Sequence, residues 1–205
     1  MLKEELYKRQ GELPLRKIES AIVVGLGGTG SWTALYLAMS GCERLHLMDS
    51  DHIELSNLNR LPFHVEGIVG KKKTEATSEF IMSRRPDCFI TTDGRAGEFS
   101  LAAVPKAAFL FDCTDSHKVQ LMLCEWAKKN KVEYIRSGYN GGTHLTVTGR
   151  VPTWGADRET TGYEIVPSWV VPAAIAAALA VSKAMYCPDT EISHDLKELG
   201  VKNEK

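Results

Sequence analysis

A glycine-rich turn is the first part of the sequence whose residue types and spacing could do chemistry. Gly-Leu-Gly-Gly-Thr-Gly begins at Gly25 and fits the pattern G-x-G-x-x-G, directly after the apolar run 21–24 and before a stretch rich in Ala and Leu. Gly25 would permit a tight turn, and Gly30 would allow close packing of the helix. Gly27 and Gly28 would let a phosphate approach the backbone, next to the free N–H groups of the helix start. We therefore expect a nucleotide here rather than a turn without a ligand.

An acidic residue follows the next predicted strand. Asp49 comes after the predicted strand 45–48, about 20 residues past the last glycine, where a carboxylate can accept hydrogen bonds from ribose hydroxyls. This arrangement suits adenosine in general. NAD-dependent redox chemistry and ATP-dependent chemistry both remain open at this point, because both ligands offer an adenosine and phosphates to the same strand ends.

The residues that follow favour ATP. Segment 49–60 resembles the block D-x-D-x-(V/I)-x-x-S-N-L-x-R of the ThiF/MoeB/HesA family, the ubiquitin-activating-type adenylyltransferases. Three further blocks match the family in its order, namely Tyr7-Lys8-Arg9-Gln10, Val69-Gly70-Lys71-Lys72-Lys73 and Asp112-Cys113-Thr114-Asp115. The resemblance covers residues 7 to about 140 and weighs against an NAD-dependent oxidoreductase.

The resemblance implies a definite activity. Such enzymes use ATP and Mg²⁺ to activate the C-terminal carboxylate of a small ubiquitin-like or sulfur-carrier protein, or of a peptide, as an acyl-adenylate, and they release pyrophosphate. The expected residue types suit that reaction, because a carboxylate that attacks an α-phosphate must overcome charge repulsion. Arg, Lys and Mg²⁺ stabilise the charge that develops and leaves.

The resemblance also implies roles for individual residues. The glycine turn, with Gly25, Gly27, Gly28 and Gly30, would hold the phosphates, and Asp49 would hold the ribose. Asn57, Arg60 and Lys73 would bind the triphosphate, and Ser56 would be a further nucleotide-binding residue. Asp115 would hold Mg²⁺, and Arg9 would reach into the partner subunit's site, which makes a homodimer necessary. The expected catalytic residues are Arg9, Arg60, Lys73 and Asp115.

Several charged residues of the matching blocks also have an ordinary structural interpretation. Residues 71–73 could be the solvated start of a helix, although three cations there oppose the helix dipole. Arg9 on a short N-terminal helix would ordinarily be a solvated charge. Asp51 could support a residue that contacts the ligand, or it could cap the turn that begins near Ile53.

The sequence departs from the family in three places. It has no C-x-x-C pair, so we expect no zinc, and residues 143–186 contain no cysteine, so we expect no thioester relay. Ser116 stands where the family usually has Asn. These departures leave adenylation untouched, because some relatives stop at the adenylate. The loop 150–167, with Trp154 and Tyr163, is where we expect a partner to bind.

The predicted elements that must position these residues alternate between strands and helices. The expected strands are 21–24, 45–48, 88–92, 107–111 and 132–135. The expected helices are 31–40, 71–85, 117–129 and 168–186. Residues 143–148 suit an antiparallel addition at the sheet edge. The pattern predicts an α/β fold, a Rossmann-like, doubly wound and mostly parallel sheet with an antiparallel edge extension.

The chain is expected to form a single ThiF-type adenylation domain over residues 1–205. Its N-terminal arm would be 1–18, with a short helix at 2–9. Its crossover loop would be 150–167, and its C-terminal tail, 189–205, would be a short helix or frayed.

Composition bounds the alternatives. The 205 residues are 43% hydrophobic and 25% charged, with a net charge of −1, which suits a folded protein and gives no surplus of positive charge for nucleic acid. The longest apolar run, 170–181, is shorter than the roughly 20 residues of a membrane span, and no secretory signal is evident. We expect a cytoplasmic protein.

The alternative to an enzyme is a catalytically reduced nucleotide-binding module that pairs with another subunit, although the charge set of Arg60, Lys73 and Asp115 argues against it.

Overall fold

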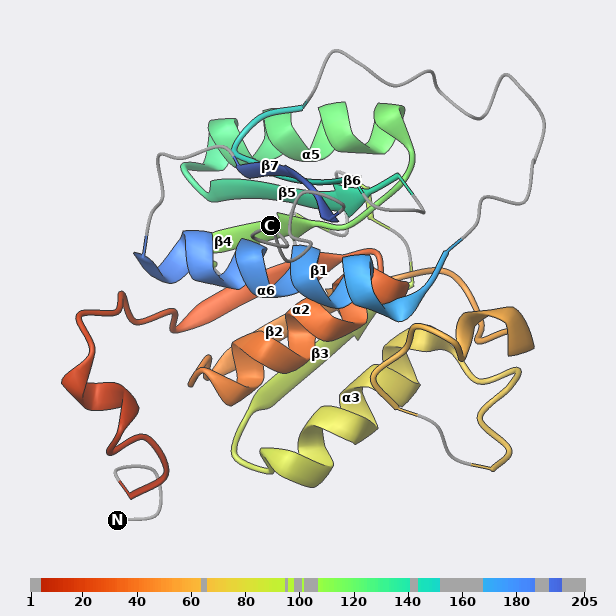
Figure 1. The fold of residues 1–205 in the computed structure, drawn as a ribbon, viewed down its shortest axis with the longest axis horizontal. Coiled ribbons are helices and arrows are strands. Elements are labelled where there is room, and N and C mark those ends of the chain that lie inside the picture. The colour runs from red at the N-terminus through yellow and green to blue at the C-terminus, as the bar shows by residue number, and fades with distance from the viewer. Residues whose placement is uncertain are drawn as a thin grey trace, which may run out of the picture.

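The computed structural model describes residues 5–63, 66–94, 96–97, 101, 107–140, 144–151, 168–186 and 192–196. Over these ranges the chain forms a seven-stranded sheet with the order β3-β2-β1-β4-β5-β6-β7 (Figure 1). The parallel strands are β1 (Ser20–Val24), β2 (Arg44–Met48), β3 (Phe89–Asp93), β4 (Phe109–Asp112) and β5 (Glu133–Tyr139). Antiparallel to β5 runs β6 (His144–Thr148), and β7 (Ile192–Asp195) pairs with β6. The Rossmann-like α/β fold with an antiparallel edge extension is therefore confirmed.

The central strands are apolar because both of their faces are covered. Every residue of β1 and of β4 is buried, as is usual for parallel strands between layers of helices. Val24 of β1 is in register with Met48 of β2 and with Asp112 of β4. The three strands therefore end at one level, and the residues that follow them meet at one edge of the sheet.

Helices cover the two faces of the sheet (Figure 1). One face packs against α2 (Gly28–Met39), α3 (Lys73–Arg84) and α6 (Val170–Tyr186), and the other packs against α5 (His117–Asn130). Alanines line the buried side of α6, including Ala173, Ala176, Ala177 and Ala180. Small side chains let α6 lie close to α2 and to the sheet, and Ser137 Oγ of β5 donates to the Ala176 carbonyl at 2.9 Å.

The predicted C-terminal tail contains a strand instead of a helix or a frayed end. Within residues 189–205, Ile192–Asp195 forms β7, in register from Val147↔Ile192 to His144↔Asp195. Ile-Ser-His-Asp has a single apolar residue, so its sequence does not predict a strand. Backbone pairing with β6 is what holds this segment. The prediction for this part of the tail was wrong.

Other terminal and loop predictions have mixed outcomes. The N-terminal arm contains a 3₁₀ helix, η1 (Gln10–Glu12), beyond the short helix expected at 2–9. Residues 152–167, most of the predicted crossover loop, lie outside the described residues. Among the residues that the structure describes, no helix has the length and apolar character needed to cross a membrane. The interpretation of the chain as one domain stays a prediction.

Candidate nucleotide-binding site

The glycine turn lies between the ends of the two strands that flank β1. Gly25 has φ +82°, and its N–H donates to the Met48 carbonyl of β2 at 2.8 Å. A Cβ added to Gly25 would lie 2.9 Å from the carbonyl oxygen of Cys113, the residue after β4. Glycine is required here both by the left-handed backbone and by the lack of space.

Two further glycines have opposite surroundings. A Cβ on Gly30 would lie 1.6 Å from the Gly25 carbonyl oxygen, so only glycine lets α2 begin this close to the turn. A Cβ on Gly27 would meet no atom within 4 Å. Gly27 is also the N-cap of α2, and no side chain caps the helix there. The start of α2 thus combines free backbone N–H groups with open space, as an anion requires.

Asp49 anchors the turn from the end of β2. Its Oδ2 accepts from the Leu26 N–H at 2.6 Å, and its Oδ1 accepts from the Asp51 N–H at 2.7 Å. Burial raises the pKa of Asp49, and the nearby charge of Lys73 lowers it in part. Each carboxylate oxygen has a second lone pair, so this residue can still accept a hydroxyl while it holds the turn.

Lys73 is held beside Asp49 by an ion pair. Lys73 Nζ lies 2.8 Å from Asp51 Oδ2, and the Lys73 side chain is 12% exposed against 64% for that of Asp51. The Lys73 N–H also donates to the Asp51 carbonyl at 3.0 Å, where α3 begins. Of the two roles expected for Asp51, the structure shows the supporting one.

Arg60 lies against the start of α2. A Cβ on Gly28 would lie 3.1 Å from Arg60 Cδ, and Trp32 Nε1 of α2 donates to the Arg60 carbonyl at 3.0 Å. The guanidinium donates through Nη1 to the Ser56 carbonyl at 2.7 Å and to Asn59 Oδ1 at 3.0 Å. This predicted residue therefore reaches the glycine turn from a segment about 30 residues away in sequence.

Ser56 and Asn57 belong to the 3₁₀ helix η2 (Leu55–Asn57), next to Arg60. Asn57 is buried, and its Oδ1 accepts from the Glu54 N–H at 3.2 Å as part of a capping box. The Ser56 hydroxyl donates to Glu54 Oε2 at 3.3 Å. These two side chains therefore stabilise the short helix that carries the Ser56 carbonyl to Arg60.

Asp115 follows a loop that is fixed from both sides. The buried carboxylate of Asp112 accepts at Oδ1 from the Thr114 N–H (3.0 Å) and hydroxyl (2.7 Å), and at Oδ2 from the Tyr134 hydroxyl (2.5 Å). Gln120 Nε2 of α5 donates to the Thr114 carbonyl at 2.9 Å. Asp115 itself is exposed and, among the described residues, has no hydrogen bond or ion pair. Its carboxylate is available to a ligand.

Tyr134 and Gln120 were missed at the level of sequence. A buried aspartate needs donors, so the signal for them was the position of Asp112 at the end of an apolar strand. Burial raises the pKa of Asp112 and that of Tyr134. Burial also raises the pKa of the adjacent Cys113 thiol to about 12. At neutral pH this cysteine is a poor nucleophile.

Arg9 lies away from these residues in its own chain. The N-terminal arm docks at the far end of α2, where the Tyr7 hydroxyl donates to the Ala38 carbonyl at 3.2 Å and Gln10 Nε2 donates to the Ser40 carbonyl at 2.7 Å. A helix of this length separates its two ends by about 18 Å. The structure therefore brings together the glycine turn, Asp49, Arg60 and Lys73, with Asp115 after the neighbouring strand β4, but it does not bring Arg9 to them within one chain.

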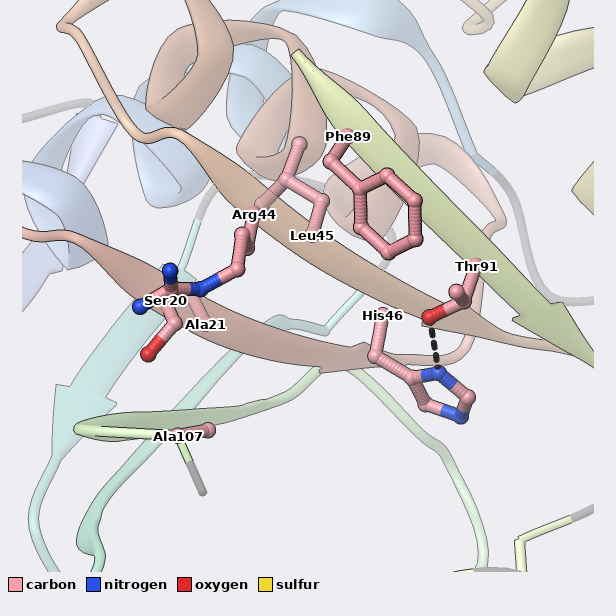
Figure 2. A pocket seen from close by; sticks show the side chains of 8 residues that line it. All are labelled: Ser20, Ala21, Arg44, Leu45, His46, Phe89, Thr91 and Ala107. Atoms are coloured by element: carbon pink, nitrogen blue, oxygen red, sulfur yellow. Dashed lines mark hydrogen bonds between the residues drawn. The ribbon is translucent and has the colours of Figure 1, made fainter. Parts of the chain in front are cut away.

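Two hollows in the molecule lie apart from the glycine turn. The smaller, about 20 Å³, is lined by the first residues of β1, β2 and β3 and by His46 (Figure 2). His46 Nδ1 lies 2.7 Å from Thr91 Oγ1, whereas its Nε2 is buried without a partner among the described residues. This space suits one water molecule rather than a nucleotide. The larger hollow, about 280 Å³, is lined by residues that include Phe63, Ile68, Lys71 and Phe80.

The residues at the carboxyl edge fit ATP with Mg²⁺. The start of α2 offers space and N–H donors to a phosphate, and Arg60 and Lys73 offer positive charge. Among the described residues no group of three or more His, Cys, Asp or Glu side chains could hold a metal ion. Mg²⁺ does not need such a cage, because it is commonly held by one or two carboxylates together with phosphate oxygens.

Comparison with known proteins identifies the class of this chain. The model of the ThiF family matches residues 4–164. The chain therefore belongs to the ThiF family, as the sequence blocks predict.

Among curated relatives, the chain is 33% identical over 127 residues to tRNA threonylcarbamoyladenosine dehydratase of Haemophilus influenzae, covering 58% of this chain and 47% of the relative. It is 35% identical over 158 residues to adenylyltransferase and sulfurtransferase MOCS3 of Drosophila virilis, covering 76% of this chain and 34% of the relative. The chain thus spans half or less of the length of these relatives.

Solved structures share the fold. Escherichia coli MccB, determined with ATP, superposes with a TM-score of 0.68 at 20% identity, covering 95% of this chain and 65% of MccB. TcdA (CsdL) superposes with a TM-score of 0.57 at 26% identity, covering 62% of this chain and 54% of TcdA.

Proposed function

We propose that this protein is an ATP-dependent adenylyltransferase that activates the C-terminal carboxylate of a small ubiquitin-like or sulfur-carrier protein, or of a peptide, as an acyl-adenylate. The observation that carries the proposal is one edge of the sheet, where an open glycine turn lies beside Arg60 and Lys73 and where the exposed carboxylate of Asp115 follows β4. Membership of the ThiF family, relatives named adenylyltransferases and the fold shared with MccB support it.

In the proposed reaction a carboxylate oxygen of the substrate attacks the α-phosphorus of ATP. The bond to pyrophosphate breaks, and its electron pair leaves with the pyrophosphate. Arg60 and Lys73 lower the charge repulsion between the two reactants and stabilise the leaving group. The N–H groups at the start of α2 orient the phosphates, and Asp49 accepts from the ribose.

Asp115 is the proposed ligand for Mg²⁺. When bound, the ion supplies charge neutralisation on the phosphates of ATP. The fixed loop before Asp115 is what this chain contributes, because Asp112 and Gln120 hold Thr114 on both sides. A carboxylate on a rigid loop has little freedom to lose when it binds a ligand.

Arg9 is proposed to complete the site from a second subunit of a homodimer. Within one chain the arm that carries it is docked at the opposite end of α2 from the glycine turn. We expect an exposed arginine held there to meet the nucleotide of a second molecule. A cytoplasmic location stays a prediction.

A carboxylate carried by tRNA is the second candidate substrate, because some relatives are named tRNA threonylcarbamoyladenosine dehydratases. The net charge of −1 weighs against it, since tRNA binding draws on positive charge. Both candidates share the adenylation step and differ only in the acyl substrate.

ATP–pyrophosphate exchange tests the proposal directly, because it reports reversible adenylate formation. The assay uses the full chain with small proteins ending in Gly-Gly, with short peptides and with tRNA as separate arms. We expect exchange to need one of these substrates and to be lost in Asp115→Ala and Lys73→Ala. Lys72→Ala is the matched control, because the Lys72 side chain is 59% exposed and its ion pair among the described residues is a long one, 3.8 Å from Glu75.

The arms of the assay separate the candidate substrates from each other and from a protein that only binds nucleotide. Exchange with the Gly-Gly proteins or peptides alone supports the proposal, and exchange with tRNA alone replaces the substrate. If no arm supports exchange although ATP raises the melting temperature, the protein is a nucleotide-binding module that pairs with another subunit, and the proposal is wrong.

A further inference from the structure

An arginine near the proposed site is not fully hydrogen-bonded within the part of the chain that the structure describes. Arg136 lies on β5, in register with Asp112 at the end of β4. Its Nε is buried and has no hydrogen-bond partner among the described residues. A guanidinium is always charged in proteins, and a charge with buried donors is costly unless an anion or acceptors meet it. The buried Nε–H of Arg136 therefore needs an acceptor that the described residues do not supply.

Asp112 does not serve as that partner, although it is the carboxylate nearest in register. Its Oδ1 accepts from the Thr114 N–H and hydroxyl, and its Oδ2 accepts from the Tyr134 hydroxyl. The charge of Arg136 acts on Asp112 only through space. The buried Nε–H is left without an acceptor among the described residues.

The guanidinium is directed toward the carboxyl edge of the sheet. A Cβ added to Gly138 would lie 3.1 Å from Arg136 Nη1 and 3.6 Å from its Nη2. Gly138 is two residues farther along β5, which continues to Tyr139, whereas β4 ends opposite Arg136. The charged group therefore lies over Gly138, at the level of the residues that follow β4 and that lead to Asp115.

A second unpartnered polar group lies opposite the same glycine. Thr146 of β6 is directly paired with Gly138 and is 3% exposed. Its Oγ1 is buried and has no hydrogen-bond partner among the described residues. Directly opposed residues of antiparallel strands share a face of the sheet, about 5 Å apart. The hydroxyl and the guanidinium thus converge above a position that has no side chain.

We propose that Arg136 and Thr146 form a subsite that binds a carboxylate of the acyl substrate. The inference rests on the proposed function and deepens it. A guanidinium presents parallel N–H donors that match the two oxygens of a carboxylate, and the threonine hydroxyl adds one more donor. The carboxylate comes either from the terminus that is activated or from an acidic side chain close to it.

The experiment observes the Arg136 Nε–H resonance by ¹⁵N NMR in the full chain, assigned by its absence in Arg136→Lys. Three tripeptide probes are titrated: Ala-Gly-Gly with a free terminus, Ala-Gly-Gly amide, and N-acetyl-Glu-Gly-Gly amide. We expect a saturable shift with at least one carboxylate probe and none with Ala-Gly-Gly amide. The first probe reports a terminal carboxylate and the third reports a side-chain carboxylate, so the responding probe identifies the source.

Two variants test the two groups separately. Arg136→Gln should weaken binding of the responding probe at least about tenfold, and Thr146→Val, which keeps the shape, by about fivefold. Arg44→Gln is the matched control at the opposite end of the strands and should leave probe binding unchanged. If Arg136→Gln fails to fold, the wild-type titration still decides.

Equal shifts from the amide and the carboxylate probes, or no saturable shift from any probe, would overturn the subsite. Stabilisation by ATP is measured in parallel on the wild-type chain. If ATP stabilises the fold but no probe reaches Arg136, only the subsite fails. If ATP has no effect, it is the proposed function that fails.

Discussion

At the scale of single residues, the pairing of Lys73 with Asp51 defines how the site holds its positive charge. A partly buried lysine beside an exposed aspartate is poised to exchange one anion for another, because the 2.8 Å contact is open to solvent on the Asp51 side. We expect Asp51→Asn to raise the KM for ATP a few-fold and Lys73→Ala to lower exchange by about 100-fold. In the double variant the loss should equal that of Lys73→Ala alone.

Exchange rates of the four proteins in this cycle give the coupling between the two residues. If the two losses simply multiply, Asp51 acts independently of Lys73, and the positioning role is excluded. Thermal unfolding of each variant checks that the fold is retained.

Asp112 makes the stability of the molecule depend on pH. Burial raises its pKa in the folded state above the value near 3.9 of the unfolded chain. The stability that this group contributes is therefore fully present below about pH 3.9 and is lost as pH rises through the folded pKa. Asp112→Asn removes the titration and keeps an oxygen for Thr114 and a polar group for Tyr134.

Urea unfolding of both proteins from about pH 4 to 8 measures this effect. The free energy of unfolding of the variant, relative to the wild type, should increase as pH rises. Parallel pH profiles for the two proteins would show that Asp112 has the same pKa in the folded and unfolded chains.

At the scale of elements, two glycines of the turn between β1 and α2 have different roles: Gly30 is needed for packing, and Gly27 is expected to be needed for binding. In Gly30→Ala the new Cβ would overlap the Gly25 carbonyl oxygen at 1.6 Å, so α2 must move away from β1. We expect a loss of roughly 1–3 kcal/mol in stability together with the loss of ATP binding. A shift at the start of α2 moves Gly28 and therefore changes its contact with Arg60.

Gly27→Ala is the matched substitution in the same turn. Its Cβ meets no protein atom within 4 Å, so the free energy of unfolding should stay nearly unchanged. The methyl group would fill the space proposed for a phosphate, and ATP should stabilise the variant much less than the wild type. Calorimetry measures the thermal stability of both variants with and without ATP. Normal stabilisation of Gly27→Ala by ATP would show that the turn does not bind the phosphates.

At the scale of the whole molecule, the position of Arg9 determines whether one chain is sufficient. We expect Arg9→Ala and Lys73→Ala each to abolish exchange alone. Mixed in equal amounts and allowed to exchange subunits, they should recover about a quarter of the wild-type rate, because half of the dimers are mixed and each has one intact site. Exchange assays and light scattering on the mixture measure rate and mass. A monomer, or a mixture with no recovery, would contradict a role for Arg9 in a second subunit.

The alternation of strands and helices was readable along the chain because parallel strands covered on both faces are continuously apolar. Residues 21–24 and 107–111 carry that signal without any knowledge of their neighbours. The strand β7 does not, because Ile192–Asp195 has one apolar residue and is held by pairing with β6. Backbone hydrogen bonds to a distant strand leave no pattern in the residues that make them.

For the site, the sequence by itself determined the glycine turn, Asp49 and the charged residues of the matching blocks, since each follows a strand and strand ends meet at one edge. The tertiary structure alone decided that Asp51 holds Lys73, that Tyr134 supports Asp112, and that Arg136 lies over Gly138, the residue paired with Thr146. These contacts join residues on different elements, and their geometry depends on register and facing. Register is set by the packing of the whole sheet, so no single segment contains it.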